Sequence, residues 1–282
     1  MATQSPAQER AQVIPPSSAP HPRVFKHTGF TSRFLQGERD ISVYVPPGYE
    51  EATERQYPLL ILQDGQNLFD PETAFIRGKT WRVAESADDS IDAGKVEPLI
   101  IAGVANAGER RLAEYTPSRD MKLGGGDASQ YALMVTRELL PFLRANYRLR
   151  SGPAHTGIGG SSLGALASLW IGLRHAEIFG QLAVLSPSVW WNHRYILAYL
   201  NDVAPELVRR PRVWLDVGDQ EGRRTLADAR ALDARLLALG WRADVDLHFE
   251  EVAGGTHDEP SWAERVRPML RFLFPAERRD SR

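Results

Sequence analysis

A serine flanked by two glycines is the pattern in this chain best suited to covalent chemistry. Ser162 has Gly160 two residues before it and Gly164 two residues after it, which completes a Gly-x-Ser-x-Gly pattern. Ser161 does not fit this pattern, because Leu163 stands where its second glycine would have to be. A nucleophile on a sharp, strained turn leaves no room for side chains two residues away in either direction. The spacing therefore predicts that Ser162 is a nucleophile at a strand-to-helix turn.

A histidine and a carboxylate must accompany this serine, because a hydroxyl alone is a poor nucleophile. Of the seven histidines, His257 is the best candidate for the general base, because its glycine-containing loop joins the last expected strand to the last expected helix. Two carboxylates, Asp219 and Glu221, follow the strand expected at 212–217, and the local pattern does not choose between them. Asp216 lies within that strand and is expected to have a structural role.

The oxygen that becomes negative during acyl transfer needs backbone N–H donors. Leu163 follows the serine at a helix N-terminus, where N–H groups lack partners within the helix, and it is the first expected donor. The second is expected in the turn after the apolar run 58–62. Gly65 in that turn permits a close backbone approach, which favours the N–H of Gln66 as the second donor.

Hydrophobic periodicity predicts the elements that position these residues. Continuously apolar runs are typical of strands buried on both faces, and they occur at 58–62, 98–105, 181–185 and 212–217. Runs that alternate between polar and apolar residues are expected nearer the sheet edges, at 40–45 and 243–252. Helical patterns lie between them, at 129–147, 163–174, 226–239 and 262–274. This alternation predicts an α/β domain with a mainly parallel sheet, whose ligand crevice is bounded by the loops 106–127 and 187–195.

Composition narrows the class of protein further. The 282 residues, 43% of them hydrophobic, suit one large α/β domain. A net charge of −2 offers no basic surface for nucleic acid or an anionic membrane. The chain contains no cysteine, which excludes disulfides, thiolate metal sites and a cysteine nucleophile. No apolar run approaches the ~20 residues that a membrane span requires.

The two ends of the chain differ from its centre in composition. Residues 1–23 are rich in Pro, Ser, Ala and Gln and lack the apolar core of a secretory signal, so we expect a disordered leader there. The catalytic domain is then expected at 24–276, followed by a short tail at 277–282. Because no signal peptide or membrane span is visible in the sequence, the expected location is cytoplasmic.

With these residues assigned, the chain resembles the putative-esterase family of α/β-hydrolases, which includes enterochelin, feruloyl and acetyl-xylan esterases, esterase D and the mycolyltransferases. The chain order of serine, acid and histidine is also that of α/β-hydrolases. The resemblance extends over 32–274, and its matching segments are 44–49, 64–70, 114–117, 160–164, 179–180, 186–191 and 254–257. It implies an α/β-hydrolase fold with a mostly parallel sheet of about eight strands flanked by helices.

The resemblance also assigns residues that the local pattern leaves open. The family places its acid three residues after the glycine that ends the seventh strand, and that position here is Glu221. Trp190 and Trp191 resemble the part of the family that shapes an aromatic-lined acyl pocket, with packing beneath a loop as the alternative role for each. The implied function is hydrolysis of a small-molecule carboxylic ester through an acyl-enzyme on Ser162, with His257 as base and without a metal ion or organic cofactor. The alternatives are an acyltransferase with the same residues, or a non-catalytic binding module on the same scaffold.

Overall fold

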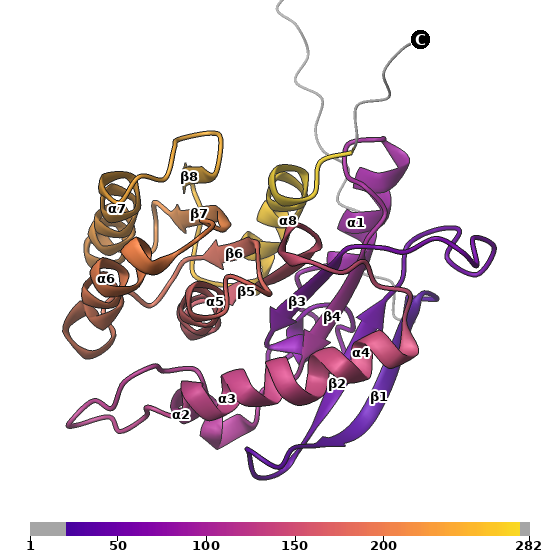
Figure 1. The fold of residues 1–282 in the computed structure, drawn as a ribbon, viewed down its shortest axis with the longest axis horizontal. Coiled ribbons are helices and arrows are strands. Elements are labelled where there is room, and N and C mark those ends of the chain that lie inside the picture. The colour runs from indigo at the N-terminus through magenta and orange to yellow at the C-terminus, as the bar shows by residue number, and fades with distance from the viewer. Residues whose placement is uncertain (1–20, 277–282) are drawn as a thin grey trace, which may run out of the picture.

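A single mixed sheet organises the part of the chain that the computed structural model describes, residues 21–276 (Figure 1). Its eight strands follow the order β1-β2-β4-β3-β5-β6-β7-β8. β2 runs antiparallel to both of its neighbours, β1 and β4, whereas the strands from β3 to β8 are parallel to one another. The strand bounds are β1 Val24–Thr31, β2 Glu38–Tyr44, β3 Leu59–Gln63, β4 Ile100–Val104, β5 Thr156–Ser161, β6 Gln181–Leu185, β7 Arg212–Gly218 and β8 Leu247–Val252.

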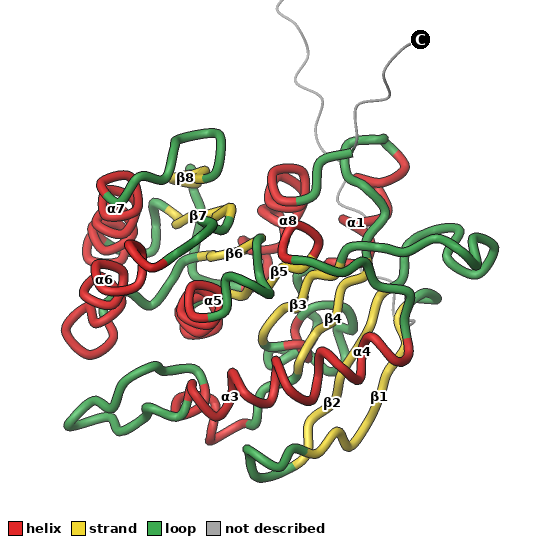
Figure 2. Tube along the Cα trace, in the orientation of Figure 1, coloured by secondary structure: helices red, strands yellow, loops and turns green. Residues whose placement is uncertain are grey.

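Helices cover both faces of this sheet, as Figures 1 and 2 show. α1 and α8 pack against each other on one face and close a core that includes Trp81, Leu185 and Met269. The helices from α3 to α7 enclose a larger core on the other face. The helix bounds are α1 Val83–Asp92, α2 Arg111–Glu114, α3 Ala128–Met134, α4 Leu140–Asn146, α5 Leu163–Arg174, α6 Trp191–Val203, α7 Arg223–Ala238 and α8 Glu259–Leu273, with short 3₁₀ turns at Gly65–Asn67, Gly108–Arg110, Pro153–His155 and Ala204–Glu206.

The predicted α/β class and mostly parallel sheet are confirmed. The four continuously apolar runs form β3, β4, β6 and β7, all inside the sheet, where both faces are covered. Of the two alternating runs, the second forms the edge strand β8, and the first forms β2, next to the opposite edge. The helix expected at 129–147 occurs as α3 and α4, joined by a π-helical segment, Val135–Leu139.

Three elements depart from the sequence prediction. β1 has mainly exposed or half-exposed side chains, so it lacks the apolar alternation that marks a strand. α1 buries positions at helical spacing, but apart from Val83 they are alanines and serines, so its buried face is only weakly apolar and the sequence analysis did not recognise it. α6 begins inside the expected loop 187–195, and its residues 192–194 have positive φ angles of 40°, 57° and 64°. Three consecutive non-glycine residues in this left-handed region form an irregular start that no sequence pattern indicates.

The expected leader and tail lie mostly outside the described residues. Of the segment 1–23, only 21–23 are described, and there the Arg23 guanidinium pairs with Asp88 of α1. The segment 277–282 lies outside the described residues altogether. The domain boundaries at 24 and 276 therefore stay predictions.

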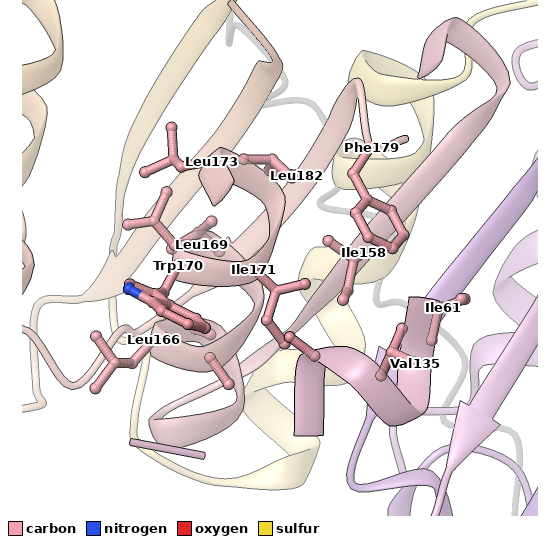
Figure 3. Close-up of a cluster of buried hydrophobic side chains, with 14 of the residues drawn as sticks. Ile61, Val135, Ile158, Leu166, Leu169, Trp170, Ile171, Leu173, Phe179 and Leu182 are labelled. Carbon is pink, nitrogen blue, oxygen red and sulfur yellow. The ribbon is translucent and has the colours of Figure 1, made fainter. Parts of the chain in front are cut away.

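The unit formed by β5 and α5 is packed tightly from both sides. α5 is buried along its length, and Ile158, Phe179 and Leu182 gather beside it in the larger core (Figure 3). β5 approaches β6 so closely that a Cβ added to Gly159 would lie 2.4 Å from the Cβ of Ala183. Because such interiors are close-packed and yield little, the turn between β5 and α5 rests on a rigid support.

A buried ion pair connects the antiparallel part of the sheet to the segment that follows β4. Arg39 of β2 donates hydrogen bonds of 2.9 and 3.3 Å to the two carboxylate oxygens of Glu114 in α2. Both side chains are almost completely buried. Neither charge has access to water, so each depends on the other for compensation.

Removal of one partner from this pair should therefore be costly. We predict that Glu114→Ala lowers the free energy of unfolding by about 3–5 kcal/mol, measured by urea denaturation. The double variant Arg39→Met/Glu114→Leu should recover most of this loss, because it leaves no unpaired buried charge. Glu72→Ala, which breaks the exposed pair between Glu72 and Arg77, is the control and should cause no measurable change. Equal losses in the single and double variants would contradict this account.

Candidate active site

Ser162 lies at the sharp turn between β5 and α5. Its φ of 56° and ψ of −121° belong to a region that residues other than glycine rarely adopt. As predicted, neither flanking position has room for a side chain, because a Cβ added to Gly160 or to Gly164 would come within 3.0 Å of the Gln63 side chain. The turn therefore holds the serine in a strained conformation close to the end of β3.

The structure brings the three predicted side chains together at the carboxyl edge of the sheet. His257 Nε2 lies 3.0 Å from Ser162 Oγ, and His257 Nδ1 lies 2.7 Å from Glu221 Oε2. Ser162 follows β5, Glu221 follows β7 and His257 follows β8, so three separate strand ends supply them. Because ionised Glu221 can only accept hydrogen bonds, Nδ1 carries the proton and Nε2 is free to accept the serine proton.

The carboxylate of Glu221 is fully buried but surrounded by donors. Its Oε1 accepts hydrogen bonds of 2.6 Å from the Ser186 hydroxyl and 2.7 Å from the N–H of Gly218, and Arg265 of α8 lies 3.3 Å away. Burial would raise the pKa of Glu221, but the hydrogen bonds from His257, Ser186 and Gly218 outweigh burial, so its pKa lies below the usual value. Glu221 is therefore a charged partner for the imidazole at neutral pH.

The other two carboxylates of this region are engaged elsewhere. Asp219 accepts a hydrogen bond of 2.9 Å from the N–H of Gly254, in the loop that carries His257, and its carboxylate does not contact the imidazole. Asp216 is fully buried and accepts hydrogen bonds from Arg265 and Trp214. Burial is the main reason why the pKa of Asp216 is raised to about 6. The alternative that the sequence left open, between Asp219 and Glu221, thus has a geometric answer: only Glu221 contacts His257.

The two predicted oxyanion donors follow neighbouring strands: Leu163 comes after β5 and Gln66 after β3. Neither the N–H of Leu163 nor that of Gln66 donates to a backbone carbonyl within residues 21–276. The turn that carries Gln66 is held by a hydrogen bond of 3.1 Å from the N–H of Asn106 to its side-chain oxygen. A Cβ on Gly65 would come within 2.5 Å of the Gly103 backbone, so this turn sits directly against β4. Both amides are free to bind a ligand, and their role stays a prediction.

The two predicted tryptophans have different surroundings. Trp191 is only 1% exposed, and its indole N–H donates to the Ser118 carbonyl at 3.0 Å. Trp190 is 37% exposed and lies against Trp191, with ring centroids 5.8 Å apart. Of the two rings, only Trp190 therefore has surface that a ligand from solvent can contact. Trp191 packs against Trp190 and anchors the loop that contains Ser118.

Sequence reasoning did not single out two serines of the segment 186–191. Ser188 Oγ lies 3.3 Å from Ser162 Oγ, and Ser186 donates to Glu221. The only signal for either was membership of a segment that matches the family, because nothing in a serine's immediate sequence indicates a partner 26 or 35 residues away. Within residues 21–276, no group of three or more potential metal ligands gathers, and no helix there is long and apolar enough to cross a membrane.

Comparison with known proteins identifies the family. The model of the family described as "Putative esterase" matches residues 32–273. The chain belongs to this family. The uncharacterized protein YbbA of Bacillus subtilis (strain 168) is 26% identical over 69% of this chain and 74% of its own length. The iron(III) salmochelin esterase of Escherichia coli is 28% identical over 84% of this chain, which spans only 55% of that protein.

The fold agrees with this assignment. The BES protein of Bacillus cereus matches with a TM-score of 0.73 at 23% identity, over 96% of this chain and 99% of that one. The resemblance predicted from the sequence is thus confirmed, and the chain is placed among the carboxylic ester hydrolases.

The strain at Ser162 can be measured as stability. Glycine adopts positive φ without steric cost, whereas alanine does not. We predict that Ser162→Gly is more stable to unfolding than Ser162→Ala by about 1 kcal/mol, measured by thermal denaturation of the two variants side by side. A more stable alanine variant would show that the turn is not strained.

Proposed function

We propose that this esterase-family protein hydrolyses carboxylic esters through an acyl-enzyme on Ser162, with His257 as general base and Glu221 as the orienting acid. The observation that carries the proposal is the unbroken run of hydrogen bonds from Ser162 Oγ through the imidazole to the buried carboxylate, at 3.0 and 2.7 Å. Both distances lie within the reach required for proton transfer between a nucleophile and its base.

In the proposed reaction, Ser162 Oγ attacks the ester carbonyl carbon while His257 Nε2 takes the hydroxyl proton. The N–H groups of Leu163 and Gln66 bind the carbonyl oxygen as it becomes negative. The imidazolium then gives its proton to the departing alcohol, which leaves an ester on Ser162. A water molecule, deprotonated by the same imidazole, attacks this ester, and the acid is released as the imidazolium returns its proton to Ser162 Oγ. Glu221 keeps Nδ1 protonated throughout and stabilises the positive imidazolium.

The substrate that we propose is a small-molecule ester, without a nucleic-acid or membrane partner. Salmochelin esterase, a relative, is named for a siderophore ester, and an ester of that general kind is one candidate here. Trp190, beside the turn that carries Ser188, is the proposed wall for an apolar or aromatic acyl group, and Trp191 supports that wall. A cytoplasmic location and independence from metals and organic cofactors belong to the same proposal.

An acyltransferase remains the second candidate, because the same three residues can pass the acyl group to an alcohol instead of water. Reaction of purified protein with an aryl ester in the presence of added alcohols or trehalose distinguishes the two: free acid as the sole product supports hydrolysis, whereas a new ester supports transfer. A non-catalytic binding module is disfavoured, since it would not need an oriented imidazole and a buried charged carboxylate.

Loss of the serine hydroxyl should abolish the reaction without loss of the fold. We predict that Ser162→Ala lowers kcat on a p-nitrophenyl short-chain ester by a factor of about 10⁴ or more, while the circular dichroism spectrum stays that of the wild type. Ser161→Ala is the matched control, because Ser161 precedes the turn within β5. Retained activity in Ser162→Ala would remove this residue from the mechanism.

The choice between the two acids is also testable. We predict that Glu221→Gln lowers kcat by a factor of about 10³–10⁴, because a neutral amide neither holds the imidazole tautomer nor stabilises its charge. Asp219→Asn should lower it by less than about tenfold, since Asp219 contacts the backbone of the histidine loop but not the imidazole itself. The reverse order of effects would assign the acid to Asp219.

The wild-type rate should rise with pH and reach a plateau, because general-base catalysis requires a neutral imidazole that can accept the serine proton. Glu221 does not limit the rate over the neutral pH range, since its lowered pKa keeps it ionised there. The pH dependence of kcat/KM on the aryl ester measures this rise. A flat profile over that range, with chemistry rate-limiting, would argue against His257 as the base.

A further inference from the structure

Ser186 occupies a position where all its hydrogen-bonding capacity is used. Its Oγ accepts hydrogen bonds from the indole N–H of Trp262 at 3.0 Å and from Arg265 Nη1 at 2.8 Å, and it lies 2.6 Å from Glu221 Oε1. A hydroxyl has two acceptor positions and one hydrogen. Trp262 and Arg265 can only donate, so they fill both acceptor positions. The single hydrogen of Ser186 must therefore point to Glu221.

The direction of this hydrogen bond constrains the acid. A protonated carboxyl group could not donate to Ser186, because the serine oxygen has no free acceptor position. Glu221 Oε1 also accepts the N–H of Gly218, so two donors fix this oxygen as an acceptor. The other oxygen, Oε2, is thereby left to the imidazole of His257. The hydroxyl thus fixes both the charge state and the rotation of the carboxylate.

The backbone at Ser186 is strained as well. Its φ is 44°, and the residue is completely buried at the end of β6. A non-glycine residue in this region is energetically unfavourable and persists only where the surroundings hold it in place. Glycine would relieve the strain but would remove the hydroxyl, so the presence of serine indicates that the hydroxyl has a use.

Both donors to Ser186 come from one turn of α8, which also supports the histidine. The Trp262 ring lies edge-on to the imidazole of His257, with centroids 5.0 Å apart. Arg265 Nη2 donates to the carbonyl of Thr256, the residue before the histidine, at 3.1 Å. Arg265 Nη1 additionally binds Asp216 at 2.8 Å. The same helical turn therefore positions the histidine loop directly and the acid through Ser186.

We propose that Ser186 is a positioning residue for the esterase reaction: a hydroxyl, oriented by Trp262 and Arg265, that holds Glu221 as an ionised acceptor facing His257. This proposal rests on the proposed function, since it assigns Glu221 the role of orienting acid. The charged groups that face Glu221 are His257, Arg265 and Asp216. None of them replaces the hydroxyl, because Arg265 approaches Glu221 only at 3.3–3.4 Å.

Two substitutions separate the hydroxyl from the backbone strain. Ser186→Ala removes the hydroxyl and keeps the strain, whereas Ser186→Gly removes both. We expect each to lower kcat on an aryl ester by about tenfold to a hundredfold, the effect of one lost hydrogen bond to a charged group, with KM nearly unchanged. The glycine variant should nevertheless melt at a higher temperature than the alanine variant. Ser90→Ala, a buried serine of α1 that donates to the Ser86 carbonyl, is the control and should keep the wild-type kcat.

The pH profile provides a readout that a purely structural role would not change. The Ser186 hydrogen bond is one of the contacts that lower the pKa of Glu221, so its loss raises that pKa. Protonation of Glu221 should then add a second step to the acid limb of kcat/KM, which becomes steeper than the wild-type limb in both variants. Trp262→Phe, which frees one acceptor position on Ser186, should steepen the limb by a smaller amount. This third variant decides the matter if the two Ser186 variants do not fold.

The outcomes separate this proposal from the proposed function. If the wild type hydrolyses the ester, Ser162→Ala does not, and the folded Ser186 variants keep both the wild-type kcat and the wild-type acid limb, the positioning role is overturned and the function stands. Activity that is lost in Ser186→Ala but retained in Ser186→Gly would assign the effect to strain and overturn the role of the hydroxyl. If the wild type hydrolyses no ester of a panel, both proposals fall.

Discussion

The hydrogen bond between His257 and Glu221 is the interaction on which the rest of the site depends. It joins a fully buried carboxylate to a part-exposed imidazole at 2.7 Å, and a buried charge without partners would be too costly to keep. The fold meets that cost with donors from three places: Gly218 at the end of β7, Ser186 at the end of β6, and Arg265 on α8. In the proposed reaction, the imidazole is oriented because the carboxylate is held, and the serine is activated because the imidazole is oriented.

Much of the candidate site could be predicted from the sequence, since several of its requirements are local in the chain. Two glycines around Ser162 mark a turn with no space for side chains, and a loop between a strand and a helix is where His257 can reach over the sheet edge. The choice of Glu221 over Asp219 could not be predicted from the local sequence pattern. It depends on the path of the turn after β7, where Asp219 binds the Gly254 N–H and leaves Glu221 to reach the imidazole. The proposed role of Ser186 could not be predicted from the sequence either, because its partners lie on the loop between β7 and α7 and on α8 and come together only in the folded chain.

The fold could be predicted from the sequence where burial requires a regular pattern of apolar residues, and it could not be predicted where burial requires no such pattern. The parallel strands inside the sheet are apolar throughout because both of their faces are covered, and this makes β3, β4, β6 and β7 easy to recognise. β1 leaves most of its surface in solvent, so it lacks the contrast between faces that periodicity detects, whereas the face that α1 buries consists mainly of alanine and serine, which mark a core face only weakly. The left-handed residues at the start of α6 belong to the same class, because their conformation is imposed by the surrounding structure and not by residue type.

The most direct test of the account is the identity of the residue that a fluorophosphonate modifies. Such a reagent phosphonylates a serine only when a base has activated it and donors stabilise the charged oxygen. We predict a single adduct on Ser162, found by mass spectrometry of the digested protein, and no adduct in the Glu221→Gln variant within the same reaction time. Absence of any adduct, or an adduct on Ser161, Ser186 or Ser188 in its place, would contradict the claim that the assembled residues activate Ser162.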